Sequence, residues 1–341
     1  MNLRIETLRG LACLLLVSYH VIGSDPDHGL RVADGMVRWV NDGLAYLRMP
    51  LFTFVSGLVY GLRPFAGDSH AFLWGKARRL LLPMLFVGTA FALLQAFTPG
   101  TNSKIGPWYL IHVQPVAHFW FLESLLWVFV AVWAIERWRL MLSPNGMAAV
   151  LTTSCAVYVT IRGTTWFGLE GAIYLIPYFL LGLAVSRFEL TSRLSTTAVG
   201  LGLALLAAAC MVGLGVPEPN PDRRTPLILV TGFALVLWTL SWGWTSPRLA
   251  QIGRYSYAIF LFCVFFTAAT RIALERVGVQ DVMVHIFLGS VVGLAGPILI
   301  ERWVSQFKLP ALLLLGKPIR RGHVTATPLA TVSSDTAVSA T

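Results

Sequence analysis

Two ionisable residues, Arg9 and His20, lie eleven positions apart in the first apolar stretch of the chain, Leu8–Gly23. In an α-helix, eleven residues at about 100° each come within roughly 20° of three full turns, so both side chains project from one face. Along the axis they are roughly 16 Å apart, about half the thickness of a bilayer's hydrocarbon core. Ionisable groups at such depths are costly and usually functional. A structural reading stays open, in which Arg9 only sets the orientation of the helix and His20 is a satisfied core histidine.

A histidine at this depth suits acyl transfer to a hydroxyl group. That reaction needs a base for the hydroxyl proton, donors for the oxyanion and a site for the carrier of the acyl group. An unperturbed imidazole has a pKa of about 6.5, so its neutral form accepts a proton at physiological pH. We therefore expect His20 to act as the general base. Glu6 is expected to hold Arg9 through an i,i+3 ion pair, although a simple interfacial salt bridge has the same spacing.

A basic cluster, Lys76, Arg78 and Arg79, comes just before the apolar run that begins at Leu80. Such clusters mark the cytoplasmic end of a membrane span. Arginine also pairs its planar donors with phosphate oxygens, so the cluster is equally suited to hold the phosphates of an acyl-coenzyme A. In that case the thioester arm would reach from this cluster toward His20.

Polar residues also lie near the first residues of the second and fourth apolar stretches, on the side of the membrane opposite to the basic cluster. Because both of these stretches are expected to start outside, their first residues share a leaflet with His20. We expect them to bind the acceptor, and the candidates are Arg48, Ser56, His118, Trp120 and Glu123. A carboxylate near the start of a span needs a partner, so Glu123 is expected either to orient an imidazole, His20 or His118, or to balance Arg48.

The composition indicates a membrane protein with several spans. Of 341 residues, 56% are hydrophobic and 12% are charged, whereas charged residues make up about a quarter of a soluble domain. The net charge of +10 lies mostly in short loops between apolar stretches, which argues against nucleic-acid binding. All four cysteines lie inside apolar stretches without a metal or disulfide motif, so we interpret them as small hydrophobic residues and expect no metal.

Ten apolar stretches predict an all-α bundle of about ten transmembrane helices. They cover residues 7–24, 43–62, 79–97, 118–138, 146–162, 168–186, 196–215, 225–243, 254–273 and 282–302. With an N-terminus inside, 17 of the 26 Lys and Arg residues fall on the inner side, which predicts that both termini are cytoplasmic. The first stretch lacks a cleavage pattern and is expected to remain as a helix. Residues 1–316 are expected to form one membrane domain, and residues 317–341 a disordered cytoplasmic tail.

The sequence resembles the bacterial membrane acyltransferase-3 family in several motifs that follow in family order over most of residues 4–316. The first is the pair Arg9 and His20, with ten residues between them, in the context Ile5-Glu6-Thr7-Leu8-Arg9-Gly10-Leu11-Ala12. The others are Arg48-Met49-Pro50-Leu51-Phe52 through Ser56-Gly57, Arg78-Arg79 with Pro83, Trp120-Phe121-Leu122, Pro177-Tyr178-Phe179-Leu180-Leu181-Gly182, and Ile252-Gly253 through Ser256-Tyr257. The ten-helix bundle of the family agrees with the number of apolar stretches.

The resemblance implies transfer of an acyl group, expected to be acetyl, from cytoplasmic acyl-coenzyme A. The acceptor would be a hydroxyl of a sugar, a polysaccharide precursor or a glycosylated metabolite, and the enzyme would lie in the bacterial inner membrane. By position, His20 is similar to the essential histidine, Arg9 to its motif partner, and Arg78 or Arg79 to the donor-site arginine. One motif departs from the family pattern: Cys263 ends the stretch Phe260-Leu261-Phe262-Cys263, where relatives often have histidine.

Two other classes of function remain open at this point. A proton-coupled transporter or flippase of a lipid-linked or amphipathic substrate would use Arg9 and His20 as a proton relay. A structural membrane subunit would use them for packing alone. The sequence shows neither a repeat of 20–50 residues nor an inverted pair of glycine-broken spans, which disfavours a transporter. The acceptor, the acyl chain length and the oligomeric state are left open.

Overall fold

The computed structural model describes residues 2–99, 106–193, 195, 197–202 and 224–319, and within these residues the chain forms only helices and loops. The first half of the chain contains α1 (Leu3–Ile22), α2 (Met36–Gly43), α3 (Ala45–Leu62), α4 (Ser69–Phe97), η1 (Trp108–Leu110), η2 (Ala117–Phe119), α5 (Trp120–Arg137), η3 (Leu140–Leu142) and α6 (Pro144–Thr160). The second half contains η4 (Trp166–Gly168), α7 (Leu169–Arg187), η5 (Leu190–Arg193), α9 (Pro226–Ser241), α10 (Pro247–Arg254), α11 (Ser256–Arg276), α12 (Val282–Val304) and α13 (Lys308–Leu315).

Seven helical segments of the described chain are long and apolar enough to cross a membrane. They are Leu3–Ile22, Met36–Leu62, Ser69–Phe97, Ala117–Arg137, Trp166–Arg187, Ser256–Arg276 and Val282–Val304. The predicted stretches at 146–162 and 225–243 are also helical, as α6 and α9, but these helices have only 17 and 16 residues. The predicted stretch at 196–215 and the predicted tail lie mostly outside the described residues. The chain is thus an all-helical, multi-pass membrane protein with at least seven candidate spans.

The helix α4 begins ten residues earlier than the sequence predicted. Its first residue is Ser69, and the side chain of Asp68 caps it by accepting a hydrogen bond from the backbone N–H of His70, 2.8 Å away. The prediction placed the start at residue 79 because the basic cluster interrupts the apolar run. Charged residues end an apolar run but not a helix, so α4 carries this cluster in its third turn.

Reciprocal glycines let two helix pairs cross with their backbones in contact. A Cβ atom at Gly57 of α3 would lie 2.0 Å from the carbonyl oxygen of Phe179, and one at Gly182 of α7 would lie 2.0 Å from that of Phe54. In the same way, Gly10 of α1 faces Leu249 of α10. Small residues at such crossings let membrane helices approach closely. The glycines of the recognised motifs therefore hold the bundle together.

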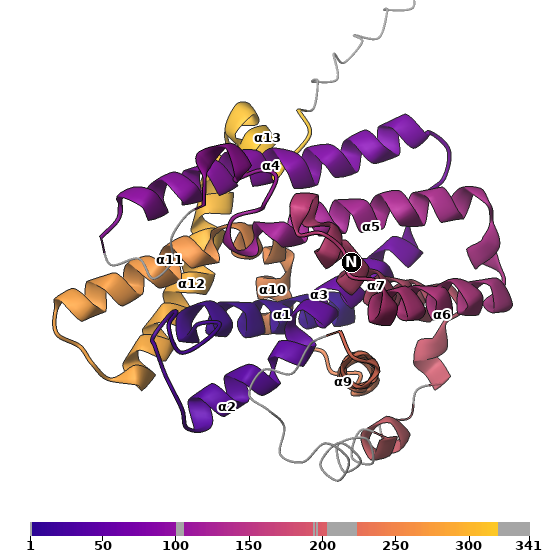
Figure 1. Cartoon of the computed structure of the whole chain (residues 1–341), viewed down its shortest axis with the longest axis horizontal. Coiled ribbons are helices and arrows are strands. Elements are labelled where there is room, and N and C mark those ends of the chain that lie inside the picture. The colour runs from indigo at the N-terminus through magenta and orange to yellow at the C-terminus, as the bar shows by residue number, and fades with distance from the viewer. Residues whose placement is uncertain (1, 100–105, 194, 196, 203–223, 320–341) are drawn as a thin grey trace, which may run out of the picture.

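The central helices α1 and α3 run through the middle of the bundle, while α4 lies along one side with α13 against it (Figure 1). The helices α11 and α12 pack side by side and both contact α1. Fully buried Cys13 and Cys263 are free thiols in the main apolar core, whereas free Cys155 is half-buried. Cys210 lies outside the described residues. This packing brings the end of α1 that carries His20 beside α3, α4, α5 and α11.

Candidate active site

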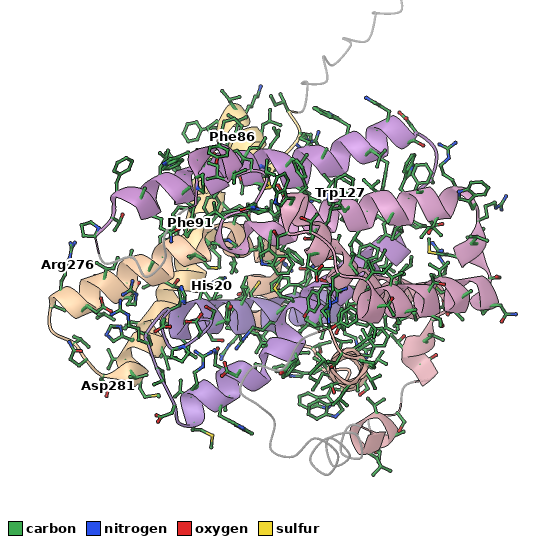
Figure 2. All side chains as sticks on the ribbon, in the orientation of Figure 1. His20, Phe86, Phe91, Trp127, Arg276 and Asp281 are labelled. Atoms are coloured by element: carbon green, nitrogen blue, oxygen red, sulfur yellow. The ribbon has the colours of Figure 1, made fainter. Side chains whose placement is uncertain are left out.

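A cavity of about 670 Å³, here called the His20 cavity, lies at one end of the bundle. Helices α1, α3, α4, α5 and α11, together with the loop that follows α1, form its wall. Four of the predicted residues line it: His20, Arg48, His118 and Trp120. His20 of α1 and Phe91 of α4, both labelled in Figure 2, contribute to this wall from the two helices. The fold thus brings these four residues together in one cavity.

Two imidazole rings meet inside the cavity. The ring centroids of His20 and His118 are 5.2 Å apart, and the rings are inclined at 62°. The Nε2 atom of His20 and both ring nitrogens of His118 are buried and make no hydrogen bond with any described residue. A buried nitrogen without a partner costs free energy, so these atoms are suited to meet a ligand. The pair forms the chemically most competent part of the cavity.

Arg48 is buried beside the two histidines and is held by neutral groups. Its Nε donates to the carbonyl oxygen of Leu15 at 3.1 Å, and its Nη2 donates to the backbone and side-chain oxygens of Asn41 at 2.5 and 2.6 Å. The guanidinium carbon lies 4.7 Å from the ring centroid of Tyr19, whose own ring contacts His20. These contacts place a fixed positive charge near the imidazoles.

Two of the predicted acceptor-binding residues lie away from the His20 cavity. The hydroxyl of Ser56 donates to the carbonyl oxygen of Phe52 at 2.9 Å, which satisfies it within its own helix. The side chain of Glu123 is buried and packs next to Gly168. Among the described residues, no ion pair joins Glu123 to His20, His118 or Arg48. The carboxylate therefore does not orient an imidazole in this structure.

Arg9 and Glu6 form the predicted ion pair, with 3.0 Å between Nη1 and Oε1. Glu6 is buried, whereas the side chain of Arg9 is 30% exposed. Arg9 does not line the His20 cavity, although Leu16, which lies on the same helical stripe, does. Cys13, between them on that stripe, is fully buried. The stripe from Arg9 to His20 is thus packed in its middle and does not form an open passage.

A second, smaller cavity of about 140 Å³, here called the Arg79 pocket, lies at the opposite end of α4. It is lined by Arg78, Arg79, Arg254, Tyr257, Glu301, Leu315, Gly316, Lys317 and Pro318. The guanidinium of Arg79 lies over the ring of Tyr257, 5.1 Å from its centroid, and Arg78 Nε donates to Gly316 at 3.2 Å. Three arginines from two helices therefore surround a polar pocket, as an anionic ligand requires.

Lys76, the third member of the predicted basic cluster, does not reach this pocket. Its Nζ atom lies 3.8 Å from the ring centroid of Phe129 and 5.2 Å from that of Phe72. The ammonium group therefore makes cation–π contacts with α5 and its own helix. Arg254, at the end of α10, lines the Arg79 pocket in place of Lys76, which was predicted there.

The two cavities share no lining residue. Along α4, Phe91 follows Arg79 by twelve positions, a rise of about 18 Å. The core between the cavities includes the buried side chains of Leu80, Met84 and Val87. A donor held at one end therefore needs a long, thin arm to react at the other.

Residues of the cavity that the sequence analysis did not single out come from two places. Tyr19 precedes His20 in α1, and its ring lines the cavity, in contact with both His20 and Arg48. Arg271, buried in α11, lines the cavity and pairs with Glu275 at 2.9 Å. An arginine inside an apolar helix is itself a signal of a functional position, and that signal was available.

The loop after α1 closes one side of the cavity through a local acid–histidine pair. His28 Nδ1 lies 2.6 Å from the carboxylate of Asp25, which also accepts from the hydroxyl of Ser24 at 2.8 Å. Burial raises the pKa of Asp25 while the hydrogen bonds from His28 and Ser24 lower it, and the hydrogen bonds prevail. The carboxyl pKa lies below its usual value, so this group is ionised at neutral pH.

The comparison with known families decides what kind of protein has this pair of cavities. A family model described as an acyltransferase domain, that of the acyltransferase-3 family, matches residues 2–302. The chain belongs to the acyltransferase-3 family. Membership supports acyltransferase activity in the membrane and confirms the resemblance found in the motifs. No curated protein and no solved structure matches the chain. In the described part of this acyltransferase, no group of three or more His, Cys, Asp and Glu side chains could hold a metal ion.

Proposed function

We propose that this protein is a membrane O-acyltransferase that moves an acyl group, expected to be acetyl, from cytoplasmic acyl-coenzyme A to a hydroxyl. The acceptor is a sugar, a polysaccharide precursor or a glycosylated metabolite. The observation that carries this proposal is the buried and unpartnered Nε2 of His20, a residue that lines a cavity of about 670 Å³ in a chain of the acyltransferase-3 family. The proposal places the protein in the bacterial inner membrane.

In the proposed reaction, His20 removes the proton of the acceptor hydroxyl. The acceptor oxygen then attacks the carbonyl carbon of the thioester, the carbon–sulfur bond breaks, and the proton passes from His20 to the leaving thiolate. The fixed charge of Arg48 favours negative charge that develops on oxygen beside it. The products are an ester and free coenzyme A.

The donor is proposed to bind with its phosphates in the Arg79 pocket. Arg78, Arg79 and Arg254 supply planar donors there. The pantetheine arm, the long chain that links the phosphates of coenzyme A to the thioester, would then span the distance of about 18 Å between the two cavities. For this arm to pass, core side chains must move. Arg9 and Glu6 are proposed to act as a positioning pair for it.

The test uses the full chain in lipid nanodiscs, with acetyl-CoA as donor and octyl β-glucoside as the hydroxyl probe. We expect thiol release that depends on the probe, together with a product heavier by one acetyl group in mass spectrometry. A protein that carries the probe across vesicles without thiol release would contradict the proposal and favour the transporter. A His20→Ala variant that releases thiol at the wild-type rate would remove the base assignment.

A further inference from the structure

His118 has the features of a second group that touches the reacting atoms. It is only 7% exposed, it lines the His20 cavity, and its ring centroid lies 5.2 Å from that of His20. Neither ring nitrogen has a hydrogen-bond partner among the described residues. The backbone of Phe260 and Leu261 approaches the ring, but outside hydrogen-bonding geometry. Buried ring nitrogens without a close partner are suited to bind a ligand that reaches them.

The backbone just before His118 has an unfavourable conformation. Ala117, just before it, has a φ of 51°, in the left-handed region that residues other than glycine seldom adopt. This turn begins η2, the short helix Ala117–Phe119 that leads into α5. Such a conformation is unfavourable and persists where surrounding structure enforces it, often at active sites. The turn therefore fixes the backbone from which the side chain of His118 projects.

Aromatic rings surround His118 on the sides that do not face the cavity. The centroids of Phe119, Phe260 and Phe91 lie 4.3, 5.1 and 6.2 Å from that of His118. No described carboxylate pairs with the ring, in contrast to a histidine that a carboxylate orients as a base. A neutral imidazole in such a cage keeps one N–H group, and a neutral histidine can polarise a carbonyl by donating this proton.

We propose that His118 donates a hydrogen bond to the carbonyl oxygen of the acyl thioester and stabilises the oxyanion that forms when His20 deprotonates the acceptor. In this proposal His20 is the base, and His118, whose ring lies directly beside that of His20, is the oxyanion donor. This inference rests on the proposed function. Removing one preorganised donor of this kind is expected to lower kcat by about 10²–10³-fold.

The direct test is the infrared band of the thioester carbonyl in acetyl-CoA labelled with ¹³C at the carbonyl, bound to the full chain. We expect the bound band to move to lower frequency in the wild type and in His20→Ala, because both keep the donor. In His118→Phe, whose ring preserves the aromatic packing, the shift is expected to vanish. A full shift in His118→Phe, or its loss in His20→Ala with His118 intact, would overturn the assignment.

Turnover supplies the second readout. His118→Phe is expected to lower kcat with an unchanged KM for acetyl-CoA, and His118→Asn, which keeps an N–H donor but cannot act as a base, is expected to recover part of it. The control is His285→Phe: His285 is buried in α12 outside the cavity, and its Nε2 lies 2.9 Å from the carbonyl oxygen of Val279. If His118→Asn were as impaired as His118→Phe, the donor role would be refuted. A wild-type protein that releases no thiol would instead refute the proposed function itself.

Discussion

The two cavities differ in whether their polar groups have a partner or contact with solvent. In the His20 cavity, Nε2 of His20 and both ring nitrogens of His118 are buried without partners, a state that costs about 1–3 kcal/mol for each group. In the Arg79 pocket, Arg79 is exposed and stacks on Tyr257, so its charge remains solvated at little cost. Stability alone explains the second arrangement but not the first. This difference supports the proposed roles, in which one end holds the charge of the donor and the other performs the chemistry.

The sharpest way to break this comparison is to remove the base. His20→Gln keeps the size and polarity of the side chain but cannot carry a proton, so kcat is expected to fall by about 10²–10⁴-fold. Binding of acetyl-CoA at the other end is expected to be unchanged, as measured by calorimetry on the full chain. Equal losses of turnover and of donor affinity would show that the two ends do not have separate roles.

A substitution in the Arg79 pocket is expected to have the reverse effect, on donor binding rather than on turnover. Arg79→Ala removes hydrogen bonds to an anion, each worth about 1.5–3 kcal/mol, so the KM for acetyl-CoA is expected to rise about 10- to 100-fold while kcat changes little. Arg63→Ala is the matched control, because Arg63 is an exposed arginine that does not line the pocket. A wild-type KM in Arg79→Ala would exclude this pocket as the donor site.

A substitution in the helix packing outside the two cavities is expected to affect turnover and donor binding together. Gly182→Ala would place a Cβ atom against the backbone of Phe54, and overpacking of this kind costs about 1–3 kcal/mol. The thermal midpoint in detergent is expected to fall, with kcat and donor affinity reduced in parallel. An unchanged midpoint would contradict the close crossing of α3 and α7.

The smallest expected effect concerns Lys76. Lys76→Met keeps the aliphatic stem and removes the charge that contacts Phe129, so stability is expected to fall by about 0.5–1 kcal/mol. Donor affinity is expected to stay at its wild-type value in the same calorimetric titration. A loss of affinity as large as that of Arg79→Ala would return Lys76 to the donor site.

The sequence was sufficient to predict an all-helical membrane protein and much of the His20 cavity. His20, Arg48, His118 and Trp120 come together because the direction of successive spans already assigns them to one leaflet. The direction of a side chain around its helix depends on the neighbouring helix. Spacing along the chain therefore could not show that Lys76 turns toward α5.

Tertiary packing also explains what else the sequence missed. Arg254 reaches the Arg79 pocket from α10, a helix that sequence patterns do not connect with α4. Glu123 was expected either beside an imidazole or beside Arg48, because all of them share a leaflet, but η4 lies against it instead. Assigning a residue to a leaflet predicts its depth in the membrane but does not predict which side chains it contacts.

The central claim is that a donor anchored at the Arg79 pocket presents its acyl carbon to His20 at the far end of α4. Bromoacetyl-CoA tests it most directly, since its acyl group alkylates a nearby nitrogen and expels bromide. Peptide mass spectrometry of the treated full chain is expected to find the adduct on His20, and Arg79→Ala to lower its yield. An adduct on other residues with His20 unmodified would contradict the account.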